Sequence, residues 1–161
     1  MPDNIERVGA GVEVHTSERH TFGTDSFLLA DFAAARRFRR ACDLGSGCGI
    51  IPLLWLREAD TAPEEAVGVD IQPEAVVLMQ KAADQPAASG RFRPLQPDLR
   101  EIRRHLPAGH FDLVTRNPPH NNVASGAPTA AGRDLIARHE PLCPPGDAPA
   151  AAAWWLGFGG S

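Results

Sequence analysis

A glycine-rich turn with an acid beside it is the first feature of this sequence that could do chemistry. The stretch ACDLGSGCGIIPLLWL places Gly45, Gly47 and Gly49 between a short apolar run and a longer one. Backbone without side chains can approach a ligand closely, and Asp43 can face the positively charged end of that ligand. A tight turn that needs glycine only for positive φ angles is the alternative, because a lone G-x-G is a weak signal.

A second acid supports the interpretation of the turn as a ligand site. Asp70 is the last strongly polar group of a β-rich run and follows the turn by roughly 20 residues, a spacing that suits a carboxylate bound to the two hydroxyls of a ribose. The dinucleotide fingerprint fits poorly, because GSGCGI lacks glycine in its sixth position. The pattern therefore favours a nucleoside cofactor other than a dinucleotide.

The elements that must hold these residues alternate between strands and helices. Apolar and β-rich runs predict strands over residues 41–44, 65–71, 92–96 and 111–115. Helical periodicity predicts helices over residues 25–38, 50–57, 73–83 and 99–105, with one more over 148–156. This alternation indicates a parallel sheet with right-handed crossovers, so we expect a doubly wound α/β fold of the Rossmann-like type.

The helix predicted over 25–38 has an apolar face. Either Thr24 or Asp25 is suited to cap its N-terminus, because a short polar side chain can bond the free N–H groups there. Plain core packing is expected for Phe27, Leu28 and Phe32, which lie on that face at helical spacing together with Ala35.

The predicted order of the strands brings two distant segments together. Pro94 and Pro97 cannot donate hydrogen bonds to a neighbouring strand, which confines strand 92–96 to an edge of the sheet. In the strand order 3-2-1-4, the fourth strand lies beside the first. The loop RNPPHNN, which follows the fourth strand, should then project over the same crevice as the glycine turn.

Composition limits the chain to one compact domain. Its 161 residues, 43% of them hydrophobic, suffice for a single core. No segment approaches the roughly 18 apolar residues of a membrane span, so we expect a soluble, cytoplasmic protein without a membrane partner. The net charge of −4 lacks the basic excess that usually accompanies a nucleic-acid partner. The sequence leaves the oligomeric state open.

The cysteines and histidines give no sign of a metal site, and one short segment is rich in arginine. An odd number of cysteines without a C-x-x-C pair favours buried or free thiols at Cys42, Cys48 and Cys143. Surface positions or local hydrogen bonds are expected for His15, His20, His105, His110 and His139. A solvated helix end is the simpler reading, and phosphate binding the alternative, for Arg36, Arg37, Arg39 and Arg40.

The glycine turn and its acids carry a resemblance to a known class of enzymes. The pattern D-L-G-S-G-C-G resembles the first motif of class I S-adenosylmethionine-dependent methyltransferases, and Asp70 resembles their ribose-binding acid. The resemblance implies S-adenosylmethionine as the cofactor. Asp98, in PDLRE, matches the residue that contacts the adenine amine in such enzymes; an N-cap of the helix after it explains Asp98 equally well, and the two roles are compatible.

The loop after the fourth predicted strand resembles the N-P-P-Y/F motif of amino-methyltransferases. Four residues carry this likeness and would form the catalytic acceptor site: Asn117, Pro118, Pro119 and His120. An aromatic amine is a poor nucleophile, so the Asn117 amide oxygen and the Pro118 carbonyl would accept its hydrogen bonds and aim its lone pair. His120 replaces the usual aromatic residue, and a proline-rich surface turn is the alternative.

Two further segments narrow the resemblance to one family. HTFGTDSFLLADFAAA and RDLIARHE are similar to segments that flank the core of bacterial tRNA1(Val) adenine-N6 methyltransferase-like proteins. The resemblance implies tRNA as the substrate, with an adenine next to the anticodon as acceptor. It also implies that Thr24 and Asp25 belong to the cofactor site, with Asp43, Gly45, Gly47 and Gly49 as the cofactor loop.

The sequence leaves competing functions open. Residues 1–23 would form an extension with room for a short hairpin, and 24–161 a single cofactor-binding domain that lacks its last three strands. We expect a truncated relative in which the fourth strand is an exposed edge. A methyltransferase for an rRNA guanine or a protein glutamine also uses N-P-P loops, and an inactive cofactor-binding fragment is a third hypothesis.

Overall fold

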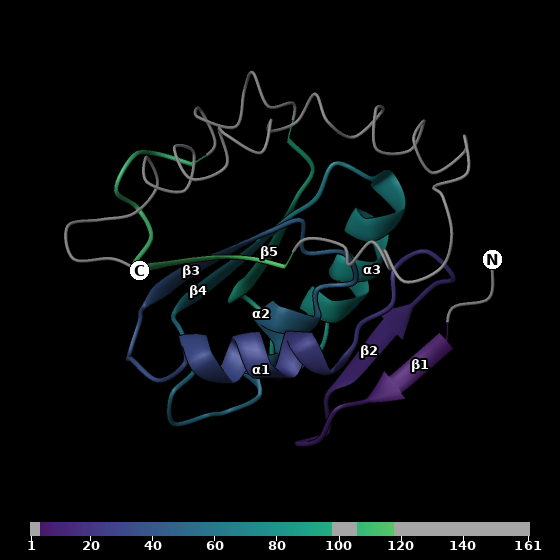
Figure 1. Cartoon of the computed structure of the whole chain (residues 1–161), viewed down its shortest axis with the longest axis horizontal. Helices are drawn as coiled ribbons and strands as arrows, with labels where there is room; N and C mark the ends of the chain where they lie inside the picture. Colours follow the sequence, from purple (N-terminus) through teal and green to yellow (C-terminus); the bar gives the residue numbers. More distant parts are fainter. Residues whose placement is uncertain (1–3, 98–105, 118–161) are drawn as a thin grey trace, which may run out of the picture.

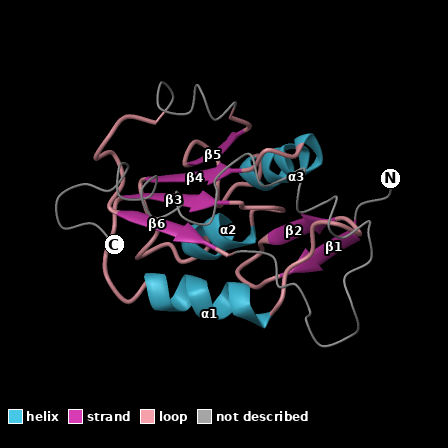
Figure 2. Ribbon diagram, turned by 45° about the horizontal axis from the view of Figure 1, so that its top comes forward, coloured by secondary structure: helices cyan, strands magenta, loops and turns pink. Residues whose placement is uncertain are grey.

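The computed structural model describes residues 4–97 and 106–117. In the described residues, the main sheet has four parallel strands in the spatial order β5-β4-β3-β6; Figure 1 labels the first three of these, and Figure 2 labels all four. The strands span Arg40–Leu44 (β3), Glu65–Val69 (β4), Phe92–Leu95 (β5) and Leu113–Arg116 (β6). This is the predicted 3-2-1-4 order with the proline-bearing strand at one edge, so the doubly wound α/β class is confirmed.

In the part of the chain that the structure describes, three helices connect or cover these strands (Figure 2). They span Thr24–Ala33 (α1), Ile50–Leu56 (α2) and Pro73–Ala83 (α3). Helix α3 has the predicted bounds, because Pro73 suits the first turn, where no backbone N–H is needed. Every residue of α2 is buried, since this short helix lies between α1 and the sheet. The predictions over 99–105 and 148–156 fall outside the described residues.

The prediction for α1 was wrong in its length and in its buried face. The helix ends at Ala33 rather than near residue 38, and Gly23 is its N-cap. Leu28 and Phe32 are 66% and 82% exposed, not packed in the core. The small residues Ser26 and Ala30 are buried instead, because small side chains allow α1 to approach α2 closely. Phe27 is half-buried against the edge of the core.

An antiparallel hairpin precedes this domain in sequence and packs against it. Its strands are β1 (Asn4–Arg7) and β2 (Glu13–Thr16), and β2 contacts α3 (Figure 1). Val12 and Val14 are buried in the main core. The Gln85 side chain, beyond the end of α3, holds the Glu13 backbone by two hydrogen bonds of 2.8 and 2.5 Å. The hairpin is therefore tied to the helical layer.

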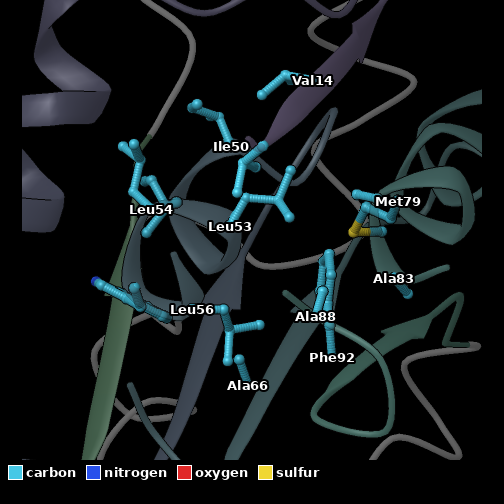
Figure 3. Packing of buried hydrophobic residues seen from close by; sticks show 14 of the residues in the cluster. Val14, Ile50, Leu53, Leu54, Leu56, Ala66, Met79, Ala83, Ala88 and Phe92 are labelled. Atoms are coloured by element: carbon cyan, nitrogen blue, oxygen red, sulfur yellow. The ribbon is translucent and has the colours of Figure 1, made fainter. Parts of the chain in front are cut away.

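Apolar clusters bury both faces of the main sheet, as expected for parallel strands. Ala41 and Ala66 face the cluster formed by α2, α3 and the hairpin, which Figure 3 shows. Cys42 and Val67, the next residue on each strand, face a second cluster with Phe111. This alternation fixes the side on which each polar residue near the strand ends emerges.

Candidate active site

The glycine turn leaves the carboxyl end of β3 in a left-handed conformation. Gly45, Gly47 and Gly49 have φ angles of 71°, 56° and 80°, which side chains rarely adopt. The N–H groups of Gly45 and Ser46 donate to the Val69 carbonyl, at 2.8 and 3.0 Å. The turn therefore needs its glycines for conformation, and it is held against the end of β4.

The first and last glycines of the turn have different surroundings. A Cβ atom added to Gly45 would meet nothing within 4 Å, so this backbone borders open space. A Cβ atom on Gly49 would lie 3.1 Å from Met79 Cγ and from the Phe92 ring. Gly49 thus allows close packing between α2, α3 and β5, whereas Gly45 leaves room for a ligand.

Asp70 connects the turn to the next strand. Its Oδ2 accepts a hydrogen bond from the Gly47 N–H at 2.9 Å, and its Oδ1 accepts one from the Gln72 N–H at 3.0 Å. The residue is 7% exposed. Each carboxylate oxygen has a second lone pair, so Asp70 can both hold the turn and accept further hydrogen bonds.

Asp43 is a buried carboxylate beneath the turn. It is 1% exposed, and the Thr115 hydroxyl donates a hydrogen bond of 2.7 Å to its Oδ1. Burial raises the pKa of Asp43 from its ordinary 3.8 to about 6, although the hydrogen bond from Thr115 opposes that rise. No basic side chain among the described residues forms an ion pair with Asp43 or Asp70.

The segment after β6 begins beside the glycine turn. Leu44 and Arg116 are paired in register, so Gly45 and Asn117 leave neighbouring strand ends. The Asn117 amide nitrogen donates to Asp25 Oδ2 at 2.6 Å and to Ser26 Oγ at 3.3 Å. The first turn of α1 therefore meets Asn117, 92 positions later in the sequence than Asp25.

Other predicted site residues are either peripheral or outside the described part of the chain. Thr24 is exposed at the start of α1, next to Asp25. The structure does not describe four predicted site residues, which are Asp98, Pro118, Pro119 and His120. Their roles remain predictions.

Sequence reasoning missed two residues of this region. Thr115 was one of them, although the strand order places it opposite Asp43 in register. His20 was expected at the surface or in a local hydrogen bond, but its side chain is 6% exposed. Its Nδ1 would lie 3.9 Å from a Cβ atom on Gly47, because the segment before α1 folds under the turn. No periodic pattern marks such a loop contact.

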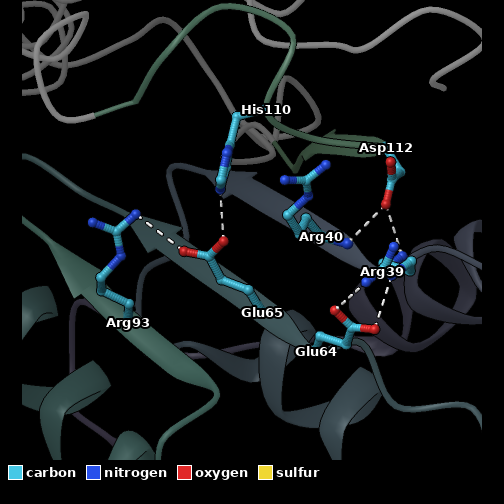
Figure 4. A network of polar contacts seen from close by, with 7 residues as sticks. All are labelled: Arg39, Arg40, Glu64, Glu65, Arg93, His110 and Asp112. Atoms are coloured by element: carbon cyan, nitrogen blue, oxygen red, sulfur yellow. Dashed lines mark hydrogen bonds and ion pairs between the residues drawn. The ribbon is translucent and has the colours of Figure 1, made fainter.

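The predicted basic segment lies at the other end of the sheet. Arg40 begins β3 and Arg39 precedes it, so both lie at the opposite end of β3 from Gly45. Arg39 forms a two-bond ion pair with Glu64, at 2.8 and 2.9 Å (Figure 4). Arg39 already has an acidic partner, which argues against a phosphate site built on it.

Comparisons with known proteins identify the family of this chain. The model of the methyltransferase small domain family matches residues 9–145. The chain belongs to this methyltransferase family. A tRNA1(Val) (adenine(37)-N6)-methyltransferase from Tolumonas auensis is 32% identical over 120 residues, which are 73% of this chain and 46% of that protein. The chain spans about half the length of the curated relatives that it matches.

Solved structures show that the fold is shared. TYW2 of M. jannaschii, solved in complex with AdoMet, has a TM-score of 0.57 and 12% identity. That match covers 74% of this chain and 52% of the other. The C-terminal domain of precorrin-6Y C5,15-methyltransferase from Rhodobacter capsulatus has a TM-score of 0.51 and 20% identity, over 77% of this chain and 60% of that one. Both likenesses concern the fold alone, since neither chain is as much as 25% identical to this one.

The described ranges, 4–97 and 106–117, contain neither a membrane-spanning helix nor a cluster of metal-binding side chains. None of the helices there is long and apolar enough to cross a membrane. No group of three or more His, Cys, Asp or Glu side chains in those ranges is arranged to hold a metal ion.

Proposed function

We propose that this member of the methyltransferase small domain family transfers a methyl group from S-adenosylmethionine to an exocyclic adenine amine of tRNA. One observation carries the proposal: the glycine turn after β3, Asp70 after β4 and Asn117 after β6 follow the carboxyl ends of neighbouring strands, and Asp43 lies in β3 beneath the turn. The names of the relatives supply the acceptor, since the two from Tolumonas auensis and Yersinia enterocolitica, each 32% identical, are named tRNA1(Val) (adenine(37)-N6)-methyltransferases.

The residues present fit a positively charged nucleoside cofactor. Asp43 is buried without a basic partner in the described ranges, and a buried carboxylate of this kind favours a nearby cation. Open space at Gly45 lets a ligand approach the backbone. Asp70 keeps acceptor capacity for ribose hydroxyls, and the resemblance gives Asp98 the adenine.

Asn117 is the described residue that would handle the acceptor. When bound, S-adenosylmethionine supplies an electrophilic methyl group. The lone pair of an adenine amine is delocalised into the ring, so the amine must be held and aimed rather than deprotonated by a strong base. The Asn117 amide oxygen can accept a hydrogen bond from that amine and hold its lone pair in line. A base inside a folded RNA would have to flip out of its stack to reach this position.

Two other functions use the same site. A guanine amine of rRNA or a glutamine amide of a protein is also a planar nitrogen that an N-P-P loop can hold. The relatives favour adenine over both. A cofactor-binding protein without turnover is the third candidate.

The decisive experiment follows a labelled methyl group. The purified chain is incubated with methyl-labelled S-adenosylmethionine and, in parallel reactions, with total tRNA, total rRNA or a protein extract, and the labelled nucleosides or amino acids of each digest are identified by mass spectrometry. We expect label in N6-methyladenosine. Asn117→Ala should lower the rate on the order of 100-fold, as for loss of one positioned hydrogen-bonding group, and calorimetry should show unchanged cofactor affinity.

Each alternative has its own outcome in this experiment. Label in a guanine nucleoside of rRNA, or in protein glutamine, would replace the adenine proposal. Cofactor binding without transfer to RNA or protein would identify a binding protein. Label in tRNA that survives Asn117→Ala would remove Asn117 from the reaction.

A further inference from the structure

We propose that Asp25 is a positioning residue for Asn117: its carboxylate holds the carboxamide so that the amide oxygen faces the acceptor amine. The inference rests on the proposed function and adds to it a residue that the resemblance had placed in the cofactor site. Asp25 acts here through another side chain, and it need not touch the cofactor or the acceptor.

The geometry of the contact supports this role. Asn117 Nδ2 lies 2.6 Å from Asp25 Oδ2 and 3.3 Å from Ser26 Oγ. Ser26 is buried and Asp25 is half-buried, so water is partly excluded from both acceptors. The two bonds use both N–H groups of the carboxamide, and its rotation is therefore restricted from two directions.

Charge determines which end of the carboxamide is turned away. An ionised carboxylate can only accept hydrogen bonds, so it must face the NH2 group rather than the oxygen of Asn117. The oxygen then points away from α1, and no described residue donates a hydrogen bond to it. A hydrogen bond from an amide N–H to an anion also polarises the amide, which makes its oxygen a better acceptor for the substrate amine.

A neighbouring glycine gives the carboxylate its space. A Cβ atom on Gly23 would lie 2.7 Å from Asp25 Oδ1, closer than such atoms approach in real structures. The Gly23 backbone, with φ −126° and ψ −174°, is extended and accessible to any residue. The glycine of the F-G-T-D segment is thus needed for room rather than conformation, and that room keeps Asp25 directed at Asn117.

A purely structural role for Asp25 is the competing explanation. An acid in the first turn of a helix stabilises the helix dipole, and Asp25 occupies that turn of α1. Such a role would change the melting temperature without acting through Asn117. The two explanations therefore differ in whether the effects of Asp25 and Asn117 are coupled.

The test is a double-mutant cycle on the full chain with methyl-labelled S-adenosylmethionine and tRNA. Asp25→Ala should lower kcat on the order of 10- to 100-fold, because small misplacements of a positioned group have effects of this size. The cofactor Kd and the KM for tRNA should change less than about twofold. The kcat of Asp25→Asn should lie between those of the wild type and Asp25→Ala, since a neutral amide can present either its oxygen or its NH2 group to Asn117. In an Asn117→Ala background, Asp25→Ala should have no further effect.

Matched variants separate positioning from stability. Asp31→Asn, which removes an exposed acid from the same helix, should leave kcat unchanged. Gly23→Ala should lower kcat while the melting temperature is kept, because the added methyl group displaces only the Asp25 carboxylate. Equal losses from Asp25→Ala in the presence and absence of Asn117 would overturn the inference.

A spectroscopic arm makes failure of the inference distinguishable from failure of the proposed function. The side-chain NH2 resonances of Asn117 in a 15N-labelled sample should shift in Asp25→Ala and stay in place in Asp31→Asn. Unchanged resonances in Asp25→Ala would overturn the contact whatever the activity. Absence of methyl transfer by the wild-type chain, with the resonance shift present, would instead count against the proposed function.

Discussion

At the amino end of the main sheet acids pair with basic side chains, whereas at the carboxyl end Asp43 and Asp70 accept hydrogen bonds only from uncharged donors in the described ranges. Glu65, at the start of β4, pairs with Arg93 at 3.1 Å and with His110 at 2.7 Å (Figure 4). At the other end of the same strands, Asp43 is bonded by a hydroxyl, and Asp70 by two backbone N–H groups. Both ends belong to the same strands, so the difference between them comes from the side chains at each end.

We interpret the difference as one between a structural arrangement and the proposed binding site. Paired charges at a surface contribute little to stability. Because the two charges largely cancel, they exert little net electrostatic attraction on a ligand. A buried carboxylate without a basic partner costs stability in the free protein, and it attracts a cation to the place where it lies. We infer that the carboxyl end of the sheet gives up stability in order to bind.

The largest effect is expected at Asp43, where lost stability and cofactor binding can both be measured. The folded chain holds the Asp43 proton more tightly, with a pKa of about 6 against 3.8, so wild-type stability falls as pH rises between these values. The loss approaches about 3 kcal/mol by linkage. Asp43→Asn should remove this loss, so that the difference between the two unfolding free energies grows from pH 4 to pH 7.

Urea unfolding across that pH range measures the effect. Calorimetry with S-adenosylmethionine at pH 7.5 should show weaker binding by the same variant. If the unfolding free energies of the two proteins changed in parallel with pH, the burial of an unpaired charge would be contradicted. Unchanged cofactor affinity would contradict the proposed role of Asp43 in binding the cofactor.

A smaller effect is expected at the hydroxyl that supports Asp43. Thr115→Val keeps the shape of the side chain but removes the donor, which should destabilise the protein by about 1–3 kcal/mol at pH 8. The Asp43 pKa should rise further, because the hydrogen bond from Thr115 lowers it. Urea unfolding at pH 4.5 and pH 8 checks this, and a loss that is larger at pH 4.5 would refute it.

Substitutions at the amino end of the main sheet should have smaller effects than those at the carboxyl end. Glu65→Gln removes the acid shared by Arg93 and His110, and we expect a loss of about 1 kcal/mol in unfolding free energy, because the pair is only half-buried. Methyl transfer and cofactor affinity should be unchanged, since the site lies at the other end of the strands. A fall in cofactor affinity with stability intact would break the division between the two ends.

The smallest effect is expected at the most exposed pair. Arg39 and Glu64 have side chains that are 75% and 63% exposed, so water and salt screen their attraction. Glu64→Gln should leave the melting temperature unchanged within error at 0.15 M salt. A measurable drop there would mean that this bidentate pair is coupled to the packing beneath it.

Local patterns predicted the parts of the fold that neighbouring residues decide. The bounds of α3 followed from Pro73 and helical periodicity, and the edge position of β5 followed from Pro94. The buried face of α1 was mispredicted at Phe32. Periodicity shows that apolar residues share a face, but it does not show which face of a helix meets its neighbour.

The sequence by itself determined the glycine turn, its acids and the strand order that brings Asn117 beside them, because each depends on residues close in the chain or on general rules of parallel sheets. Only the tertiary structure decided that Thr115 holds Asp43 and that Asp25 holds Asn117. These side chains are 72 and 92 positions apart. Side chains so far apart in the sequence meet only when whole strands and helices are positioned to within the length of one hydrogen bond, and local sequence patterns do not determine those positions.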